Sequence, residues 1–283
     1  MIDATTTLDD GRTLAFTDIG SSDGPVVFYC HGAPGGRLEL VGLDAAFAEV
    51  GVRVVTPDRP GYGGSTPLAW RTTASWADDI ATLANRIGVD RLGVMGLSSG
   101  GPYAVACAAL LPDRVCGAVV AAGNTDMSWP DAGAGYLESE LTIMALDDED
   151  AAVAYCIERY GADGSRFFDG EMDLGATDNA WLADPDNSAA LFAAMGEAFH
   201  QGVTGYAHDI TVQGRAWTFD PGSISMPVIV AHGEDDQLVP IAHSQHTASL
   251  IPGSELRIIC GRGHLSLIDE FPALAADLTL PLR

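Results

Sequence analysis

Ser98 lies in a glycine-rich turn whose residue types suit nucleophilic catalysis. The run GLSSGGP at 96–102 follows an apolar, strand-like stretch at 92–95 and precedes a helical pattern at 101–111. A serine on such a tight strand-to-helix turn is held in a strained conformation with its hydroxyl exposed, and small flanking residues make the turn possible. The sequence therefore predicts Ser98 as the nucleophile of an acyl-transfer reaction.

A serine hydroxyl needs a base and an orienting acid, and candidates for both follow later strand-like stretches. The run HGEDDQLVP at 232–240 contains Asp236, and GRGH at 261–264 ends on His264. An imidazole can remove the serine proton when a carboxylate fixes its tautomer. We therefore predict His264 as the base and Asp236 as the acid. The alternatives left open for the acid are Glu234, Asp235 and Asp126.

A second glycine-rich loop, HGAPGG at 31–36, directly follows an apolar run at 26–30. A loop of this kind can aim a backbone N–H group at a developing oxyanion. We expect the N–H groups of Ala33 and Ser99 to form an oxyanion hole and His31 to brace the loop. Phosphate binding is the rival interpretation, but the loop lacks the Gly-Lys-Ser/Thr ending of a phosphate-binding loop.

Apolar runs place each of these loops at the carboxyl end of an expected strand. Runs at 5–8 and 13–18, joined by DDGR, predict an antiparallel hairpin. Further strands are expected at 26–30, 53–56, 92–95, 116–122, 228–231 and 256–260, and helices at 38–50, 73–87, 101–111, 241–250 and 265–274. Continuous apolar strands alternating with helices indicate an α/β fold, a parallel sheet covered on both faces. In such a sheet the site lies along the carboxyl edge, where these loops would meet.

One segment interrupts the alternation of strands and helices. Between 126 and 213 helical patterns occur at 136–146, 150–160 and 189–200, without a convincing strand. We therefore predict a core of residues 1–125 and 214–283 with a helical cap inserted at 126–213. Apolar side chains in or beside this cap are candidates for a substrate pocket: Trp129, Trp181 and Tyr206 first, then Phe192, Met195 and Trp217.

The composition disfavours several kinds of partner. The formal net charge is −25, and every basic residue is arginine because the chain has no lysine. Such an acidic surface repels phosphate backbones and anionic lipids, so neither nucleic acid nor a membrane is an expected partner. The N-terminus has neither a basic start nor an apolar core, which predicts no signal peptide and a cytoplasmic protein.

No metal site is predicted. The five cysteines show no metal-ligand spacing, and those in or beside apolar runs, such as Cys260, are expected to be reduced and buried. His243 and His246 lie three residues apart on an expected helix, but no third ligand is evident, so we expect a solvated pair. His232 is expected to brace the loop that carries Asp236.

Together these motifs resemble the α/β-hydrolase superfamily from the first hairpin to the last helix. The matching segments are HGAPGG at 31–36, DRPGYGGS at 58–65, the turn around Ser98, residues 233–240 and the pair at 263–264. In this family the acid lies three residues after a glycine and shortly before Val-Pro, which is Asp236 here, and the triad follows the order Ser, Asp, His. The resemblance implies a mostly parallel eight-stranded sheet, a structural loop at 58–65 and a cis bond at Ala33–Pro34.

The resemblance also narrows the chemistry. Epoxide hydrolases and haloalkane dehalogenases of this fold place a carboxylate where Ser98 stands, so we do not expect those activities. A serine implies an acyl-enzyme formed from a small carboxylic ester or lactone, on fold-level analogy and without a cofactor.

Several alternatives share the same triad and remain open. They are a proline iminopeptidase-like aminopeptidase, a cofactor-free perhydrolase, a carbon–carbon bond hydrolase, an acyltransferase and a non-catalytic ligand-binding protein. An aminopeptidase needs acidic cap residues to hold the substrate amine, and the candidates are Glu138, Glu140, Glu158 and Glu197. The sequence leaves open whether the protein is a monomer or a homodimer.

Overall fold

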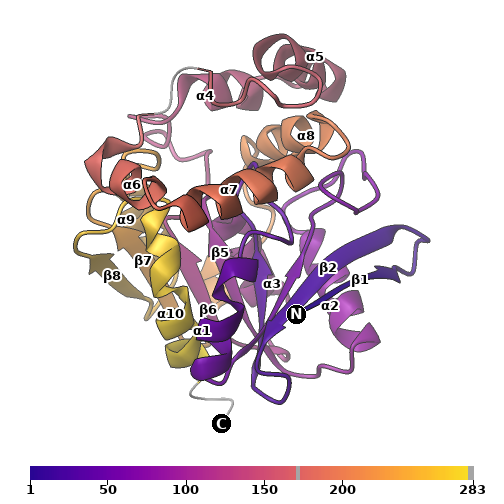
Figure 1. Ribbon diagram of the computed structural model, residues 1–283, viewed down its shortest axis with the longest axis vertical. Helices are drawn as coiled ribbons and strands as arrows, with labels where there is room; N and C mark the ends of the chain where they lie inside the picture. The colour runs from indigo at the N-terminus through magenta and orange to yellow at the C-terminus, as the bar shows by residue number, and fades with distance from the viewer. Residues whose placement is uncertain (170–172, 280–283) are drawn as a thin grey trace.

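A computed structural model describes residues 1–169 and 173–279 as one sheet flanked by helices (Figure 1). Within these residues eight strands lie in the order β1-β2-β4-β3-β5-β6-β7-β8. Their bounds are β1 Ile2–Thr7, β2 Thr13–Gly20, β3 Val26–Cys30, β4 Arg53–Pro57, β5 Leu92–Leu97, β6 Val115–Ala121, β7 Val228–Gly233 and β8 Glu255–Ile259. β2 pairs antiparallel with β1 and β4, and the other neighbours are parallel. The predicted α/β class and mostly parallel eight-stranded sheet are therefore confirmed.

Helices cover both faces of the sheet. Those outside the segment between β6 and β7 are α1 Asp44–Glu49, α2 Trp76–Arg86, α3 Gly101–Leu110, α9 Ile241–Leu250 and α10 Phe271–Thr279, with short 3-10 turns η1 Val41–Leu43, η2 Ser98–Gly100, η3 Pro221–Ser223 and η4 Ser266–Glu270. Trp76, Tyr103 and Ala248 bring α2, α3 and α9 onto one face, and Phe47 and Phe271 bring α1 and α10 onto the other. Because β3, β5 and β6 are covered on both sides, all their residues are buried.

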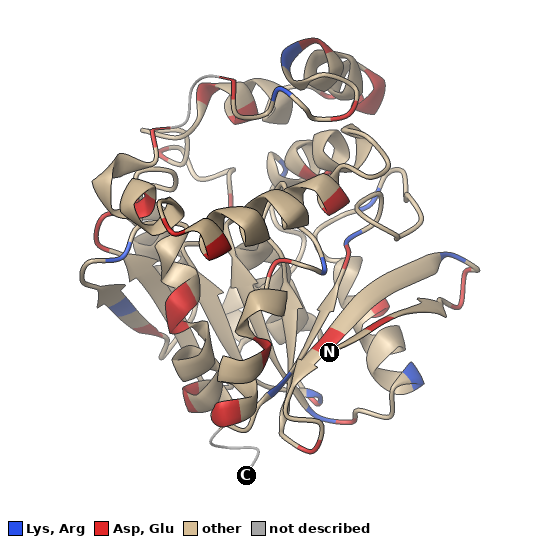
Figure 2. Ribbon diagram, in the orientation of Figure 1, with Lys and Arg blue, Asp and Glu red and all other residues tan. Residues whose placement is uncertain are grey.

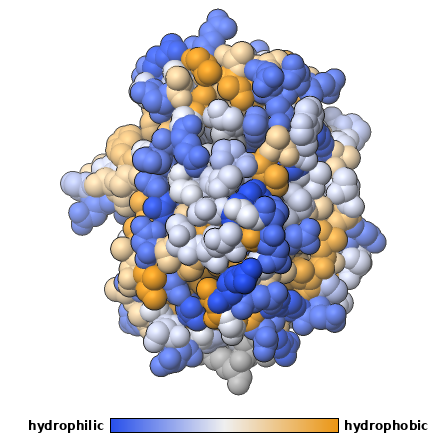
Figure 3. All heavy atoms as spheres, turned by 90° about the vertical axis from the view of Figure 1, so that its right-hand side faces the viewer, coloured by the Kyte–Doolittle hydropathy of each residue, from blue (hydrophilic) through white to orange (hydrophobic). Residues whose placement is uncertain are grey.

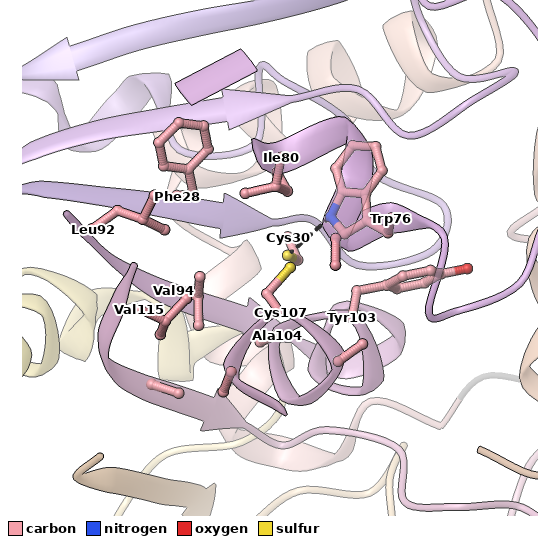
Figure 4. Packing of buried hydrophobic residues seen from close by; sticks show 14 of the residues in the cluster. Phe28, Cys30, Trp76, Ile80, Leu92, Val94, Tyr103, Ala104, Cys107 and Val115 are labelled. Atoms are coloured by element: carbon pink, nitrogen blue, oxygen red, sulfur yellow. Dashed lines mark hydrogen bonds between the residues drawn. The ribbon is translucent and has the colours of Figure 1, made fainter. Parts of the chain in front are cut away.

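The packing under α2 and α3 fixes the end of the strand that leads into the loop at 31–36 (Figure 4). Cys30 ends β3, and its side chain lies beside Trp76 of α2 and Cys107 of α3. Trp76 Nε1 donates a hydrogen bond to Cys30 Sγ over 3.4 Å. The cysteine acts as a small hydrophobe with a weak acceptor, which suits a site where a larger side chain would not fit.

The last strand differs from the expectation of a strand covered on both faces. β8 is the outer strand of the sheet, so Leu256 and Ile258 are 39 % and 40 % exposed. Cys260 directly follows this strand and is exposed, which corrects the prediction that it is buried. An apolar run looks the same in an edge strand and in a central strand, so periodicity could not separate them. Cys30 and Cys116 are free and buried, as predicted, and Cys107 and Cys156 are free and buried as well.

The segment between β6 and β7 forms a group of helices above the sheet (Figure 1). They are α4 Glu138–Met144, α5 Glu149–Tyr160, α6 Gly175–Leu182, α7 Pro185–Ala198 and α8 Thr204–Gln213, and the described part of the segment contains no strand. The sequence did not predict α6 or α8. Nearly every residue of α8 is buried, and a helix covered all round lacks the one-sided apolar stripe from which helices are recognised.

Asp and Glu residues are spread over the helices that flank the sheet and over those between β6 and β7 alike (Figure 2). The face of the molecule in Figure 3 is mostly hydrophilic, with apolar side chains in scattered patches. None of the helices in the described part of the chain combines the length and apolar character needed to cross a bilayer.

Candidate active site

Ser98 occupies the turn between β5 and α3, where its backbone has a φ of 53°. This left-handed conformation is uncommon for a residue with a side chain and marks local strain. The turn depends on its glycines: a Cβ on Gly96 would overlap the backbone at Gly100, and a Cβ on Gly100 would overlap the carbonyl oxygens of Cys30 and His31. The backbone of Ser98 therefore has the geometry expected of a nucleophile elbow.

His264 and Asp236 lie side by side, on the loops that follow β8 and β7. His264 Nδ1 is 2.8 Å from Asp236 Oδ2. The other carboxylate oxygen, Asp236 Oδ1, accepts the N–H groups of Leu238 at 2.8 Å and Val239 at 2.9 Å. Because a carboxylate can only accept, Nδ1 carries the imidazole proton and Nε2 is left as an acceptor. This is the tautomer that a general base needs to receive a hydroxyl proton.

The rival carboxylates have other surroundings. Glu234 is exposed at the surface. Asp235 Oδ2 accepts a hydrogen bond of 2.6 Å from Thr177 in helix α6. Asp126 accepts backbone N–H groups of Ser128 and Trp217. The structure thus brings Asp236, rather than one of these alternatives, to the predicted base.

Burial and charge act in opposite directions on the His264–Asp236 pair. Burial alone would lower the pKa of His264, but the facing Asp236, with smaller contributions from Asp178 and Glu39, raises it above the ordinary value. Burial alone would raise the pKa of Asp236, but His264 and its hydrogen bond lower it. The pair therefore favours an imidazolium beside a carboxylate, the state that forms when His264 accepts a proton.

His232 supports the acid from the side of the sheet, in line with the bracing role predicted for it. Its Nδ1 lies 2.8 Å from Ser244 Oγ of α9, and its Nε2 lies 3.7 Å from Asp236 Oδ2. Burial lowers the pKa of His232 by more than the neighbouring Asp236 raises it. A neutral His232 ring packs against Asp236 and leaves the carboxylate free to accept the hydrogen bond of His264 Nδ1.

Ala33 and Ser99, the expected oxyanion-hole donors, lie on different segments, the loop at 31–36 and the turn after β5. Ala33 lines the same cavity as Ser98, and the Ala33–Pro34 bond is cis, as the resemblance implied. Ser99 lies in η2, which leads into α3, and the first N–H groups of a helix have no partner within it. Ala33 thus shares the cavity of Ser98, and Ser99 is the next residue in the chain.

His31 and Arg59 hold the loop at 31–36 in place. The backbone N–H of Arg59 donates to His31 Nε2 over 2.9 Å, so His31 Nδ1 carries the proton and donates to the carbonyl oxygen of Gly32 over 2.7 Å. The guanidinium of Arg59 donates to the carbonyl oxygens of both His31 and Gly32. Burial, together with the neighbouring Arg59, holds the pKa of His31 well below its ordinary value. His31 is thus a neutral bracing residue, as predicted.

Asp209 of α8 in turn holds Arg59. Arg59 Nη2 and Asp209 Oδ2 are 2.7 Å apart, and both side chains are fully buried. Asp209 also accepts hydrogen bonds from Arg71, Tyr62 and Tyr103. Burial alone would raise the pKa of Asp209, but Arg59 and Arg71 lower it to about 2. The loop at 58–65, expected to be structural, therefore ties the loop at 31–36 to helix α8.

Ser98 and His264 open onto a common cavity of about 90 Å³. The upper helices and the loops between them contribute its roof, which consists of Tyr136, Leu137, Glu140, Phe167, Phe168, Leu174, Leu191 and Met195. A second cavity of about 150 Å³ lies beside it, and residues that border both cavities are Glu39, Leu97, Leu191 and Leu265. The two cavities are therefore neighbours that share part of their walls.

The aromatic residues predicted to line a pocket have different positions. Trp181 borders the second cavity, and its Nε1 donates to Asp269 over 3.0 Å. Tyr206 borders neither of these cavities, which corrects its assignment to the pocket, and its hydroxyl donates to Glu140 Oε1 over 3.0 Å. Trp129 borders neither cavity, which corrects its assignment to the pocket. The loop after β6 runs along α9 instead, where the Trp129 ring stacks on His246 with centroids 4.3 Å apart.

The expected solvated histidine pair is also corrected. His243 is 1 % exposed, its Nε2 lies 2.8 Å from the carbonyl oxygen of Ala132, and its ring stacks on Tyr136. The loop after β6 covers this part of α9, so the helix face is not open to solvent. The described residues contain no group of three or more His, Cys, Asp or Glu side chains that could hold a metal.

Three carboxylates that support the loops of the site are not apparent from the sequence. Asp178 binds the loop of His264, Asp209 binds Arg59, and Glu39 Oε2 accepts the N–H of Gly32 over 3.1 Å. None of these acids belongs to a local motif. Their roles depend on contacts between segments far apart in the chain, for which the sequence offers no short-range signal.

Comparisons with known proteins agree with this architecture. The alpha/beta hydrolase family profile matches residues 27–278. The chain is 30 % identical over 280 residues to a non-heme chloroperoxidase of Streptomyces lividans, covering 97 % of each chain. It is 26 % identical over 293 residues to the bifunctional esterase/perhydrolase DCH of Acinetobacter calcoaceticus, covering 98 % of each. Among solved structures, esterase RhEst1 from Rhodococcus sp. ECU1013 superposes with a TM-score of 0.71 at 22 % identity over 99 % of both chains.

The chain therefore belongs to the alpha/beta hydrolase family, and it is an enzyme of that fold.

Proposed function

We propose that this enzyme is a serine hydrolase that cleaves a carboxylic ester or lactone through an acyl-enzyme. The proposal is carried by one observation: Ser98, on its strained turn, lines one cavity together with His264, whose Nδ1 lies 2.8 Å from the buried carboxylate of Asp236. In the first step His264 Nε2 takes the Ser98 proton while Oγ attacks the carbonyl carbon. Asp236 stabilises the imidazolium that results.

The negative charge that develops on the carbonyl oxygen would be stabilised by the N–H groups of Ala33 and Ser99. Removing one such donor typically costs about 3 kcal/mol of transition-state stabilisation. The imidazolium of His264 then gives its proton to the leaving alcohol oxygen, and the acyl group stays on Ser98. Water, deprotonated by His264, attacks this acyl-enzyme; the bond to Ser98 Oγ breaks, His264 returns the proton to Oγ, and the carboxylic acid is released. These steps need no cofactor.

The two cavities suggest the size of the substrate. The first, of about 90 Å³, suits a short substituent next to Ser98. The second, of about 150 Å³, has mostly apolar walls, and an apolar cavity of about this volume can hold a benzene ring. We infer an ester or lactone with one short substituent and one apolar substituent of ring size.

In this proposal residues 126–213 are a cap that closes the site over a core of residues 1–125 and 214–283. Its support is the cavity wall: Tyr136, Glu140 and Met195 of this segment face the space next to Ser98. The cap excludes water from the site and supplies substrate contacts.

A fluorophosphonate probe and p-nitrophenyl acetate test the proposal. The wild-type enzyme should be labelled at one serine and should hydrolyse the ester, and Ser98→Ala should abolish labelling and lower kcat by about 10⁶-fold. The control is Ser99→Ala, which keeps the backbone donor and should keep most of the activity. A well-folded wild type that is neither labelled nor active would refute the proposal and favour a ligand-binding role.

The second candidate is perhydrolysis, in which hydrogen peroxide replaces water as the acyl acceptor and yields a peracid. Its support is the similarity to the chloroperoxidase and the esterase/perhydrolase over nearly the whole chain. The same triad would serve both reactions. Adding hydrogen peroxide during ester turnover and measuring peracid separates them, because a strict hydrolase forms acid alone.

A further inference from the structure

Asp178 of helix α6 is a buried carboxylate whose hydrogen bonds, within the described residues, all go to the loop that carries His264. Its Oδ2 accepts the backbone N–H groups of His264 at 2.7 Å and Leu265 at 3.0 Å. Its Oδ1 accepts the backbone N–H of Ser266 at 2.9 Å and the Ser266 hydroxyl at 2.7 Å. The side chain is 0 % exposed. An acid of the segment between β6 and β7 thus holds the backbone of the predicted base.

The fit between Asp178 and this loop is close. A Cβ on Gly263 would overlap the Asp178 carboxylate. The loop of His264 can approach this carboxylate only because the residue before His264 is a glycine. The N–H groups that converge on the carboxylate lie at the start of η4, where backbone N–H groups have no helical partner. Hydrogen bonds to a charged acceptor are shorter and stronger than neutral ones. A carboxylate, which accepts at both oxygens, matches these donors, whereas an amide would point its NH₂ group at some of them.

We propose that Asp178 is a positioning residue for His264, through which helix α6 sets the place of the base next to Ser98. The inference rests on the proposed function, because it assigns the role of base to His264. Mispositioning of a reacting group by about 1 Å can lower a rate by about 100-fold. Asp178 binds the backbone N–H of His264 itself, so a displacement of the carboxylate would displace the imidazole directly.

The negative charge of Asp178 also affects the pH–rate profile, which a purely structural role would leave unchanged. The titratable groups that face His264 are Asp236, Glu39, Glu140, His232 and Asp178 itself. Asp178 is one of the carboxylates that raise the pKa of His264. Neutralising it should therefore move the acid limb of the pH–rate profile to lower pH, which a loss of folded protein alone cannot do.

Asp178→Asn and Thr177→Val form a matched pair on adjacent residues of α6. Thr177 Oγ1 donates to Asp235 Oδ2 over 2.6 Å, so Thr177→Val also removes a tether of α6 but leaves the loop of His264 untouched. With p-nitrophenyl acetate, Asp178→Asn should lower kcat by about 100-fold with KM little changed, and should shift the acid limb downwards. Thr177→Val should stay within about twofold of wild type in kcat and keep the wild-type pH midpoint.

The outcomes separate this inference from the proposed function. If wild type is labelled by the fluorophosphonate and is active, but Asp178→Asn matches it in kcat and pH midpoint, the positioning role is refuted alone. Equal losses in both variants would also refute it, since general docking of α6 would then explain them. If Asp178→Asn does not fold, Ser266→Ala decides, because it removes the hydroxyl donor to Asp178 and should lower kcat roughly tenfold. Unchanged kcat in Ser266→Ala would then overturn the inference.

Discussion

Replacing Asp236 with asparagine tests whether this carboxylate keeps the imidazole proton of His264 on Nδ1. In Asp236→Asn the N–H groups of Leu238 and Val239, which lie 2.8 and 2.9 Å from Oδ1 in the wild type, would select the amide oxygen as their acceptor. The NH₂ group would then face His264 Nδ1, which would have to give up its proton and leave it on Nε2. In that tautomer Nε2 cannot accept the proton of Ser98. The wrong tautomer should lower kcat by about 10⁴-fold, which corresponds to about 5 kcal/mol.

Steady-state hydrolysis of p-nitrophenyl acetate measures this effect, with thermal unfolding to show that the variant is folded. The control is Asp235→Asn on the same loop, where the acid accepts from α6 rather than from His264, and kcat should stay near wild type. A loss of less than tenfold in Asp236→Asn, or an equal loss in Asp235→Asn, would refute the assignment of the acid.

Three further outcomes follow from the structure. His264 has to be neutral to accept a proton, and its pKa is raised, so kcat/KM should rise with pH through a midpoint above about 6.5. A pH–rate profile measures this midpoint, and a value below about 6.5 would contradict the effect of Asp236 on the pKa of His264. Ala194→Phe, which fills the second cavity, should lower kcat/KM for phenyl acetate and methyl benzoate at least about tenfold while sparing methyl acetate; equal losses for all three would argue against the second cavity as a subsite. Gly100→Ala, whose new Cβ would overlap the carbonyl oxygen of Cys30, should lower the free energy of unfolding by about 1–3 kcal/mol in urea titrations, and an unchanged value would contradict the tight turn.

The parts of the site that lie on strand-to-loop junctions could be predicted from the sequence. Ser98, Asp236 and His264 each follow an apolar run, and a parallel sheet brings the carboxyl ends of its strands to one edge. The glycines beside Ser98 mark the tight turn because no other residue fits there. Local pattern and sheet topology together are enough to bring these three residues toward one another.

The supporting carboxylates could not be predicted, because their roles depend on which surfaces pack together. Asp178 and Asp209 lie on α6 and α8, helices whose sequences show no clear apolar stripe. Trp129 lies in the segment predicted to be the cap and is therefore a pocket candidate from the sequence, yet the loop after β6 turns toward α9 and the ring stacks on His246. Such roles depend on which residues a side chain contacts in the folded protein. These contacts cannot be inferred from a single sequence.

The same carboxylates bear on how the segment at 126–213 relates to the rest of the chain. Asp178 satisfies backbone N–H groups at the loop of His264, and Asp209 is the counter-ion of Arg59, which is fully buried. Without these acids the core would hold unpaired donors and an uncompensated buried charge, and breaking a buried ion pair alone costs about 3–5 kcal/mol. These contacts join the segment at 126–213 to the rest of the chain at two places. Through them its carboxylates hold the loop of His264 and, by way of Arg59, the loop at 31–36, so the geometry around Ser98 depends on this segment.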